Sequence, residues 1–133
     1  MKDLSVRMII ENTSERVADV SSNDNSTAWF LWTISLKSIP VNFMEYINSV
    51  IYYLHPTFPQ NVIKSEDRES NFLLLSRGWG EFNIRVEIIL KDKRRALLNH
   101  WLSLEDENGV KKTQTTINLK DNDFKNPKIN LTK

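Results

Sequence analysis

Two short segments of the sequence carry the side chains best suited to holding a ligand. Residues 55–59 read His-Pro-Thr-Phe-Pro and directly follow a predicted strand, whereas residues 78–82 read Gly-Trp-Gly-Glu-Phe and directly precede one. The glycines on both sides of Trp79 favour positive φ and allow a ligand to approach the main chain closely. A purely structural interpretation stays open, in which Trp79 caps the core and the glycines shape a β-bulge.

Neither segment predicts an active site. The two histidines, His55 and His100, are interpreted as structural, and no spacing in the sequence supplies the further donors of a zinc site. Hydrolysis needs a nucleophile, a base and an oxyanion site, and we expect Thr57 not to face His55 on an extended loop. We therefore predict a binding protein that is not an enzyme, with no catalytic residues, no metal site and no cofactor.

The composition is that of one globular domain. The 133 residues are 40% hydrophobic and 26% charged, which is ordinary for a folded domain. Eighteen Lys and Arg against seventeen Asp and Glu give a formal charge of +1, so no nucleic-acid partner is expected. The absence of cysteine excludes disulfides, thiolate metal sites and thiol nucleophiles. No stretch approaches the ~20 apolar residues that span a bilayer, and we expect no membrane insertion by this chain.

Alternating apolar and polar residues predict the strands that position both segments. The expected strands cover residues 4–10, 29–37, 43–54, 72–75, 82–90, 96–104 and 115–119, with a helical turn near 43–48 as an alternative. Long loops are expected over 12–26 and 55–69, and turns at 91–94 and 108–109. This pattern predicts an all-β fold, an antiparallel β-sandwich of about seven to eight strands. Residues 1–121 are assigned to the domain and 122–133 to a polar tail that is frayed or pairs with a sheet edge.

Taken together and in this order, the two segments resemble those of the YEATS domain, an immunoglobulin-like β-sandwich that reads acylated lysine. The likeness extends from Trp32 through the strand ending at residues 52–54 to the return strand with His100 and Leu102, roughly half of the chain. The prokaryotic YEATS-like branch is the most similar, on the motifs Asp67-Arg68, Gly-Trp-Gly-Glu-Phe and His100-Trp101-Leu102.

The resemblance implies a role for three side chains of the first segment and for Trp79 of the second. Phe58 and Trp79 match two aromatic residues that face each other across a slot for the acyl-lysine side chain. Thr57 matches a hydroxyl residue that forms a hydrogen bond with the acyl amide. His55 matches the histidine that shapes and orders the pocket.

The second segment and the start of the strand at residues 29–37 complete the implied pocket. Gly78, Trp79 and Gly80 match the loop whose backbone N–H receives the acyl carbonyl oxygen. Some nuclear members carry a third aromatic residue a few positions before Trp32. This chain has Ala28 there, and the neighbouring Trp29 is a candidate for that wall of the pocket.

The implied ligand agrees with elementary physical chemistry. A lysine ammonium placed between two rings in a narrow, partly dry slot loses hydration at a cost of several kcal/mol, which cation–π attraction offsets only in part. Acylation removes the charge and adds a planar amide that stacks between rings while its N–H and C=O find fixed partners. A slot without a carboxylate is therefore expected to select acetyl-lysine or crotonyl-lysine on a protein or peptide partner.

Two other functions remain alternatives at this point. The first is a protein-interaction scaffold domain of a bacterial signalling or defence system that binds no acyl-lysine. The second is a binder of small molecules or nucleic acid that uses the same aromatic slot. A prokaryotic source, which the resemblance favours, implies the cytoplasm, and a eukaryotic source implies the nucleus. The sequence does not predict the oligomeric state.

Overall fold

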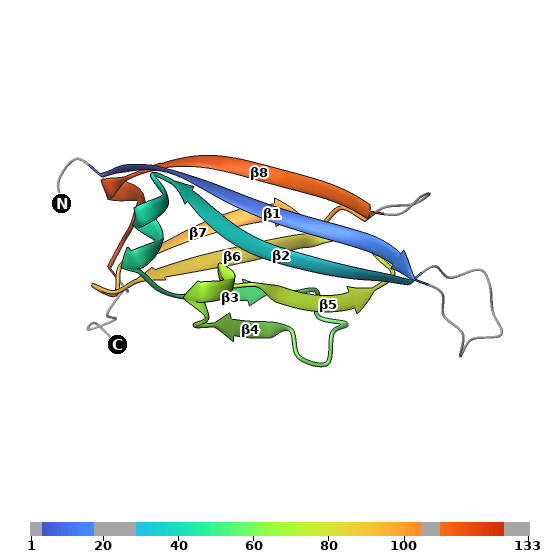
Figure 1. Ribbon diagram of the computed structural model, residues 1–133. Helices are drawn as coiled ribbons and strands as arrows, with labels where there is room; N and C mark the ends of the chain where they lie inside the picture. The colour runs from blue at the N-terminus through green and yellow to red at the C-terminus, as the bar shows by residue number, and fades with distance from the viewer. Residues whose placement is uncertain (1–3, 18–28, 105–109, 127–133) are drawn as a thin grey trace, which may run out of the picture.

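The computed structural model describes residues 4–17, 29–104 and 110–126, which form a sandwich of two antiparallel sheets (Figure 1). The first sheet, in the order β5-β2-β1-β8, consists of β1 (Ser5–Val17), β2 (Trp29–Ile39), β5 (Leu74–Gly78) and β8 (Val110–Lys120). The second sheet, in the order β4-β3-β6-β7, consists of β3 (Ile47–Tyr53), β4 (Val62–Ser65), β6 (Asn83–Leu90) and β7 (Arg95–Trp101). These eight strands confirm the predicted all-β sandwich.

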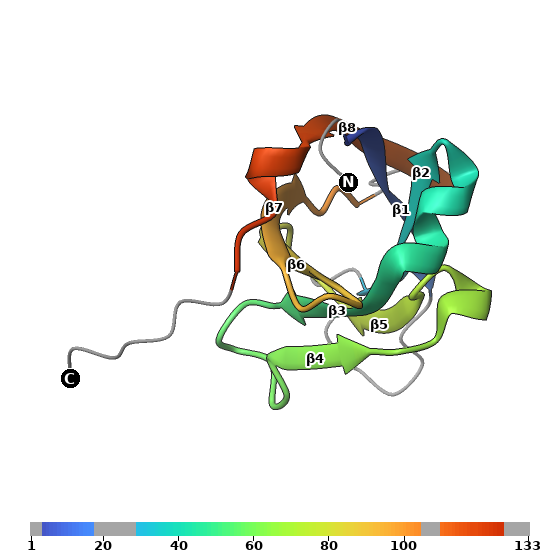
Figure 2. The ribbon, with the colours of Figure 1, turned by 90° about the vertical axis from the view of Figure 1, so that its left-hand side faces the viewer.

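The hairpin of β6 and β7 shows how the alternation in the sequence becomes a buried face. Ile84, Val86 and Ile88 of β6 are fully buried, whereas the residues between them are exposed or half-buried. The predicted turn joins the two strands, and Lys93 adopts a φ of 76° there. Figure 2, which looks along the sandwich, shows the strands arranged around a common interior. The buried side chains of both sheets form one hydrophobic core.

The first strand is longer than predicted. The expected loop over residues 12–26 is wrong for residues 12–17, because β1 continues to Val17 and pairs with β2 on one side and β8 on the other. Local polarity misled the prediction, since Asn12 and Ser14 are polar and yet 0% and 1% exposed. Residues 18–28 lie outside the part that the structure describes.

A buried polar network explains how the sandwich accommodates Asn12. Its Oδ1 lies 2.7 Å from His100 Nε2, and its Nδ2 donates to the Ser103 carbonyl oxygen at 3.0 Å. His100 Nδ1 lies 2.7 Å from Thr115 Oγ1. Because Asn12 Oδ1 can only accept, His100 carries its proton on Nε2 and accepts the Thr115 hydroxyl at Nδ1. Burial lowers the pKa of His100 to about 4, so the neutral imidazole joins β1, β7 and β8 at pH 7.

Two further segments, the expected loop over 55–69 and the expected strand over 43–54, also differ from the prediction. The expected loop over 55–69 contains β4, which pairs with β3, and a short 3-10 helix, η2 (Arg68–Ser70). The expected strand over 43–54 begins only at Ile47, because the 3-10 helix η1 (Val41–Tyr46) precedes it, in agreement with the alternative of a helical turn. Within the described ranges, no helix is long and apolar enough to cross a membrane.

The described part of the predicted C-terminal tail packs on the domain. A 3-10 turn, η3 (Asp121–Asp123), leads to Phe124, which is 3% exposed and lies 5.8 Å from Phe43 between ring centroids. The backbone of Lys125 then pairs with Arg95 at the edge of β7. An apolar side chain of the polar segment therefore reaches the core, and the expected boundary at residue 121 stays a prediction. Residues 127–133 and the predicted turn at 108–109 are not described.

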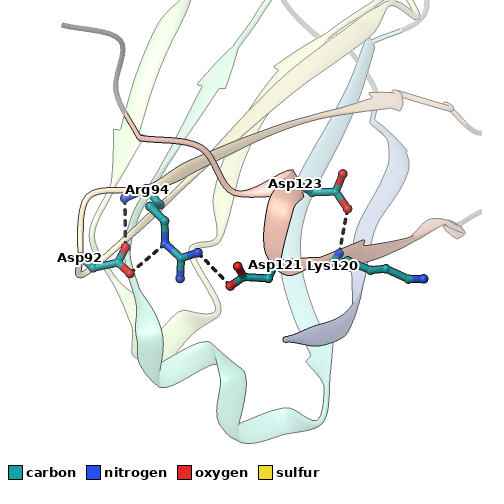
Figure 3. A network of polar contacts seen from close by, with 5 residues as sticks. All are labelled: Asp92, Arg94, Lys120, Asp121 and Asp123. Atoms are coloured by element: carbon teal, nitrogen blue, oxygen red, sulfur yellow. Dashed lines mark hydrogen bonds and ion pairs between the residues drawn. The ribbon is translucent and has the colours of Figure 1, made fainter. Parts of the chain in front are cut away.

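A small ion-pair network fastens this segment to the β6–β7 turn, and we expect it to contribute little to stability (Figure 3). Arg94 lies 2.9 Å from both Asp92 and Asp121 between the charged atoms. Such pairs near the surface typically contribute at most about 1 kcal/mol. Asp121→Asn should lower the free energy of unfolding, measured by urea titration, by less than about 1 kcal/mol, with a smaller loss in 1 M NaCl. A larger loss that salt leaves unchanged would contradict this interpretation.

Candidate functional site

The two segments singled out in the sequence meet at one end of the sandwich. The connection after β3 and the connection between β5 and β6 lie near each other, toward the right-hand end in Figure 1. Together they line an open cavity of about 520 Å³. Its lining includes all six residues expected to bind ligand, namely His55, Thr57, Phe58, Gly78, Trp79 and Gly80. The tertiary structure thus brings together side chains that stand some twenty residues apart in the sequence.

His55 and Thr57 form a compact hydrogen-bonded turn on one wall of the cavity. His55 Nδ1 lies 2.9 Å from Thr57 Oγ1 and accepts the Thr57 backbone N–H at 3.2 Å. Since a backbone N–H can only donate, these bonds assign the ring proton of neutral His55 to Nε2. The Thr57 hydroxyl then donates its own proton to Nδ1, which leaves its oxygen lone pairs for another donor.

This contact corrects the expectation that Thr57 would not face His55. The turn folds back, as the bond from the Phe58 backbone N–H to the His55 carbonyl oxygen at 3.0 Å shows, and the two side chains meet. In the part of the chain that the structure describes, no carboxylate bonds to His55. Among the described residues, the pair of His55 and Thr57 therefore has no carboxylate to orient the histidine, as a catalytic triad requires.

Phe58 is half-buried and joins a cluster of aromatic rings behind the cavity. Its ring lies 5.4 Å from Phe82 and 6.2 Å from Trp32, and the Trp32 and Phe58 planes are nearly perpendicular. The His55 ring also contacts Phe82, at 6.0 Å. Such edge-to-face and tilted contacts are favourable and fix ring orientation. The cluster therefore holds Phe58 and His55 in place without a ligand.

Trp79 differs from the other aromatic residues of the site. Its side chain is 65% exposed, so it does not cap the core and the structural interpretation of this residue is wrong. Trp79 and Phe58 line the same cavity, and no ring contact joins Trp79 to another aromatic residue of the described chain. The two rings therefore line the cavity without packing against each other. Trp29 begins β2, but its side chain lies outside the described part, so its expected place in the pocket wall stays a prediction.

The two glycines of the site do not have the conformation expected of them. Neither Gly78 nor Gly80 has a φ in the left-handed region, so positive φ is not the reason for glycine here. A Cβ at Gly78 would lie 3.6 Å from Phe58 Cζ and 3.7 Å from Trp32 Nε1. A Cβ at Gly80 would meet nothing within 4 Å. Gly78 therefore leaves room between two rings, whereas Gly80 stands in open space.

Four further residues line the cavity that the sequence analysis did not assign to it, namely Pro59, Arg77, Glu81 and Phe82. Their closeness in the sequence to the predicted site residues could have identified them, because each one directly adjoins a predicted site residue or its neighbour. Glu81 corrects the expectation of a slot without a carboxylate. Its Oε2 accepts the Leu104 backbone N–H at 2.8 Å and its Oε1 accepts Trp101 Nε1–H at 3.0 Å. The Leu104 bond, opposed by desolvation and helped by Trp101, lowers the pKa of Glu81.

The described residues include no group of three or more histidine, aspartate or glutamate side chains placed to hold a metal ion. What the site offers is an open, aromatic-walled cavity whose lining includes the Thr57 hydroxyl, an oxygen that can accept a hydrogen bond. Such a cavity between loops at one end of a β-sandwich is typical of ligand-binding domains.

Comparison with known proteins assigns this domain to a family. The model of the prokaryotic YEATS domain matches residues 30–103, and the chain belongs to this family. The AF-9 homolog of Saccharomyces cerevisiae is 30% identical over 136 residues, which cover 91% of this chain and 59% of that protein. The AF-9 homolog of Candida glabrata is 35% identical over 106 residues, covering 76% of this chain and 47% of that protein. The chain thus spans about half the length of the curated relatives it matches.

Solved structures show the same fold. The Yaf9 YEATS domain recognizing an H3K122suc peptide has a TM-score of 0.63 and 25% identity, with 92% of each chain covered. The Yaf9 YEATS domain bound to H3K27ac has a TM-score of 0.62 and 26% identity, with 91% of each chain covered. Both findings agree with the resemblance recognised in the two sequence segments.

Proposed function

We propose that this chain is a binding module that reads acylated lysine on a protein partner, with the acyl-lysine side chain lying between Phe58 and Trp79. One observation carries the proposal. A single cavity combines two aromatic walls that do not touch each other with the Thr57 hydroxyl, whose proton is engaged by His55. A flat neutral group that offers an N–H donor suits these surroundings.

The amide of an acylated lysine has each feature that the cavity requires. Its plane can stack against aromatic rings, and its N–H can donate to the lone pairs of Thr57 Oγ1. Its carbonyl oxygen can accept a backbone N–H of the segment 78–80. The ammonium of an unmodified lysine would lose hydration on entering the cavity. The aromatic rings and the Thr57 hydroxyl would not fully replace the lost contacts with water. The acyl chain beyond the amide is apolar, as is the cluster of Phe58 and Phe82.

The family and the solved structures support this proposal. Two solved structures of the Yaf9 YEATS domain, which share this fold, show it recognizing an H3K122suc peptide and bound to H3K27ac. For this chain we propose acetyl-lysine or crotonyl-lysine as the ligand. The prokaryotic family also supports a place in the cytoplasm of a prokaryotic cell.

Titration of the chain with three matched peptides tests the proposal. Acetyl-lysine and crotonyl-lysine peptides should bind at least about tenfold more tightly than the same peptide with free lysine, since the ammonium pays a desolvation penalty of more than about 1.4 kcal/mol. Isothermal titration calorimetry measures the three dissociation constants. Leu97→Ala, which shortens an exposed side chain on β7 away from the cavity, is the control for nonspecific effects. Equal affinity for all three peptides would reject acyl-lysine reading.

A scaffold function without acyl-lysine binding is the second candidate. The edge strand β7 favours it, because Leu97 and Trp101 on its outer face are 47% and 55% exposed. Exposed apolar side chains that lie together on a surface are typical of protein contact sites. A protein partner whose binding is lost on Leu97→Asp, together with three equally weak peptides in the titration above, would favour this function.

A further inference from the structure

Glu81 places a negative charge on the wall of a cavity that is proposed to exclude a positive one. The residue lines the cavity beside Trp79 and Gly80. A free carboxylate at this place would attract the ammonium of an unmodified lysine and weaken the preference for the acylated form. The position of this carboxylate therefore bears directly on selectivity.

The structure shows where the carboxylate is directed. Each of its oxygens accepts a hydrogen bond from a residue that does not line the cavity: Oε1 accepts Trp101 Nε1–H at 3.0 Å, and Oε2 accepts the Leu104 backbone N–H at 2.8 Å. Both donors belong to the segment at the end of β7, where the Leu102 N–H also bonds to the Phe82 carbonyl oxygen at 2.9 Å. Leu102 and Leu104 are buried, which anchors the donors to the core.

We propose that Trp101 and Leu104 hold the Glu81 carboxylate away from the slot, and that Trp101 is thereby a specificity-determining residue against unmodified lysine. This inference rests on the proposed function. Trp101 acts through Glu81 as a positioning residue, and it is not among the residues that line the cavity. Since hydrogen bonds to an ionised group are stronger than neutral ones, two donors hold the carboxylate in one orientation.

When one donor is removed, the Glu81 carboxylate should turn toward the slot in a fraction of the molecules. In Trp101→Phe the Oε1 lone pairs lose their partner, and the Leu104 bond alone leaves the group free to turn about Oε2. An ammonium in the slot then gains a charged acceptor, whereas an acylated lysine gains nothing. The Trp101 ring is 55% exposed, so its replacement leaves the core intact.

The test compares peptide binding by the wild type, a single variant and a double variant, with dissociation constants for acetyl-lysine and free-lysine peptides measured by calorimetry. Trp101→Phe should reduce the ratio of the free-lysine dissociation constant to the acetyl-lysine dissociation constant about fivefold. This change should come chiefly from tighter binding of the free-lysine peptide. Trp101→Phe combined with Glu81→Gln should restore the wild-type ratio, because the charge is gone. Leu97→Ala, on the same strand and the same outer face, should keep the wild-type ratio. Trp101→Leu removes the same donor and replaces the Phe variant if that variant unfolds.

The outcomes separate this inference from the proposed function. A wild-type chain that binds both peptides equally rejects acyl-lysine reading, whatever the variants do. A selective wild-type chain with an unchanged ratio in Trp101→Phe rejects the role of Trp101 and leaves the reader function standing. A reduced ratio that persists when Glu81→Gln is added also rejects it, because the effect then does not pass through the carboxylate.

Discussion

Acidification from pH 7 to pH 4 should lower the free energy of unfolding by about 3 kcal/mol through His100 alone. The side chain is 1% exposed, and burial lowers its pKa from 6.5 to about 4. The unfolded chain therefore binds a proton near pH 6.5, whereas the folded chain binds it only near pH 4. The contribution of His100 to the free energy of unfolding is fully present above pH 6.5 and is lost progressively as the pH falls toward 4.

Urea unfolding of the wild type and of His100→Gln between pH 7 and pH 4 measures this contribution. Gln keeps polar groups for Asn12 and Thr115 but does not titrate, so the variant should be less stable at pH 7 and less sensitive to acid. His55→Gln leaves the buried histidine in place and is the matched control. Carboxylates with lowered pKa, such as Glu11 and Glu81, add a common loss in acid that both variants share. Parallel pH profiles for wild type and His100→Gln would show that the buried imidazole does not carry the effect.

Gly78→Val should abolish most of the acyl-lysine affinity while the fold survives. The added Cβ meets Phe58 and Trp32 at ordinary contact distances, and the backbone φ at Gly78 suits a side chain. The γ-methyl groups extend further into the room that the glycine leaves beside the slot. Loss of a central contact at a binding site commonly weakens affinity by about 2 kcal/mol or more, which corresponds to at least about thirtyfold.

Calorimetry with the acetyl-lysine peptide measures this loss, and thermal unfolding followed by circular dichroism checks the fold. Leu75→Val introduces the same side chain on the outer face of the same strand, where the residue is 62% exposed, and should leave affinity unchanged. Trp79→Ala removes the opposite wall and should cause a loss of similar size. If Gly78→Val stays folded and binds as the wild type does, the acyl group does not enter beside Phe58.

Strands with strict alternation could be predicted from the sequence, and strands with polar inward residues could not. In β6 each inward residue is apolar, so the pattern alone identified the buried face. In β1 the inward positions after Ile10 are Asn12 and Ser14. Their burial depends on partners such as His100, which stands 88 residues away from Asn12. A pattern of neighbouring residues does not predict a hydrogen-bond partner that lies so far away in the sequence.

The sequence by itself determined the fold class and predicted six of the residues that line the candidate site, because turn residues, strand periodicity and two motifs are properties of neighbouring residues. Only the tertiary structure decided how these side chains are arranged. It turned Thr57 onto His55, left Trp79 exposed, and brought Trp101 and Leu104 against Glu81. Hydrogen-bond partners and burial arise when strands distant in the sequence pack together, so the polarity of a residue alone specifies neither.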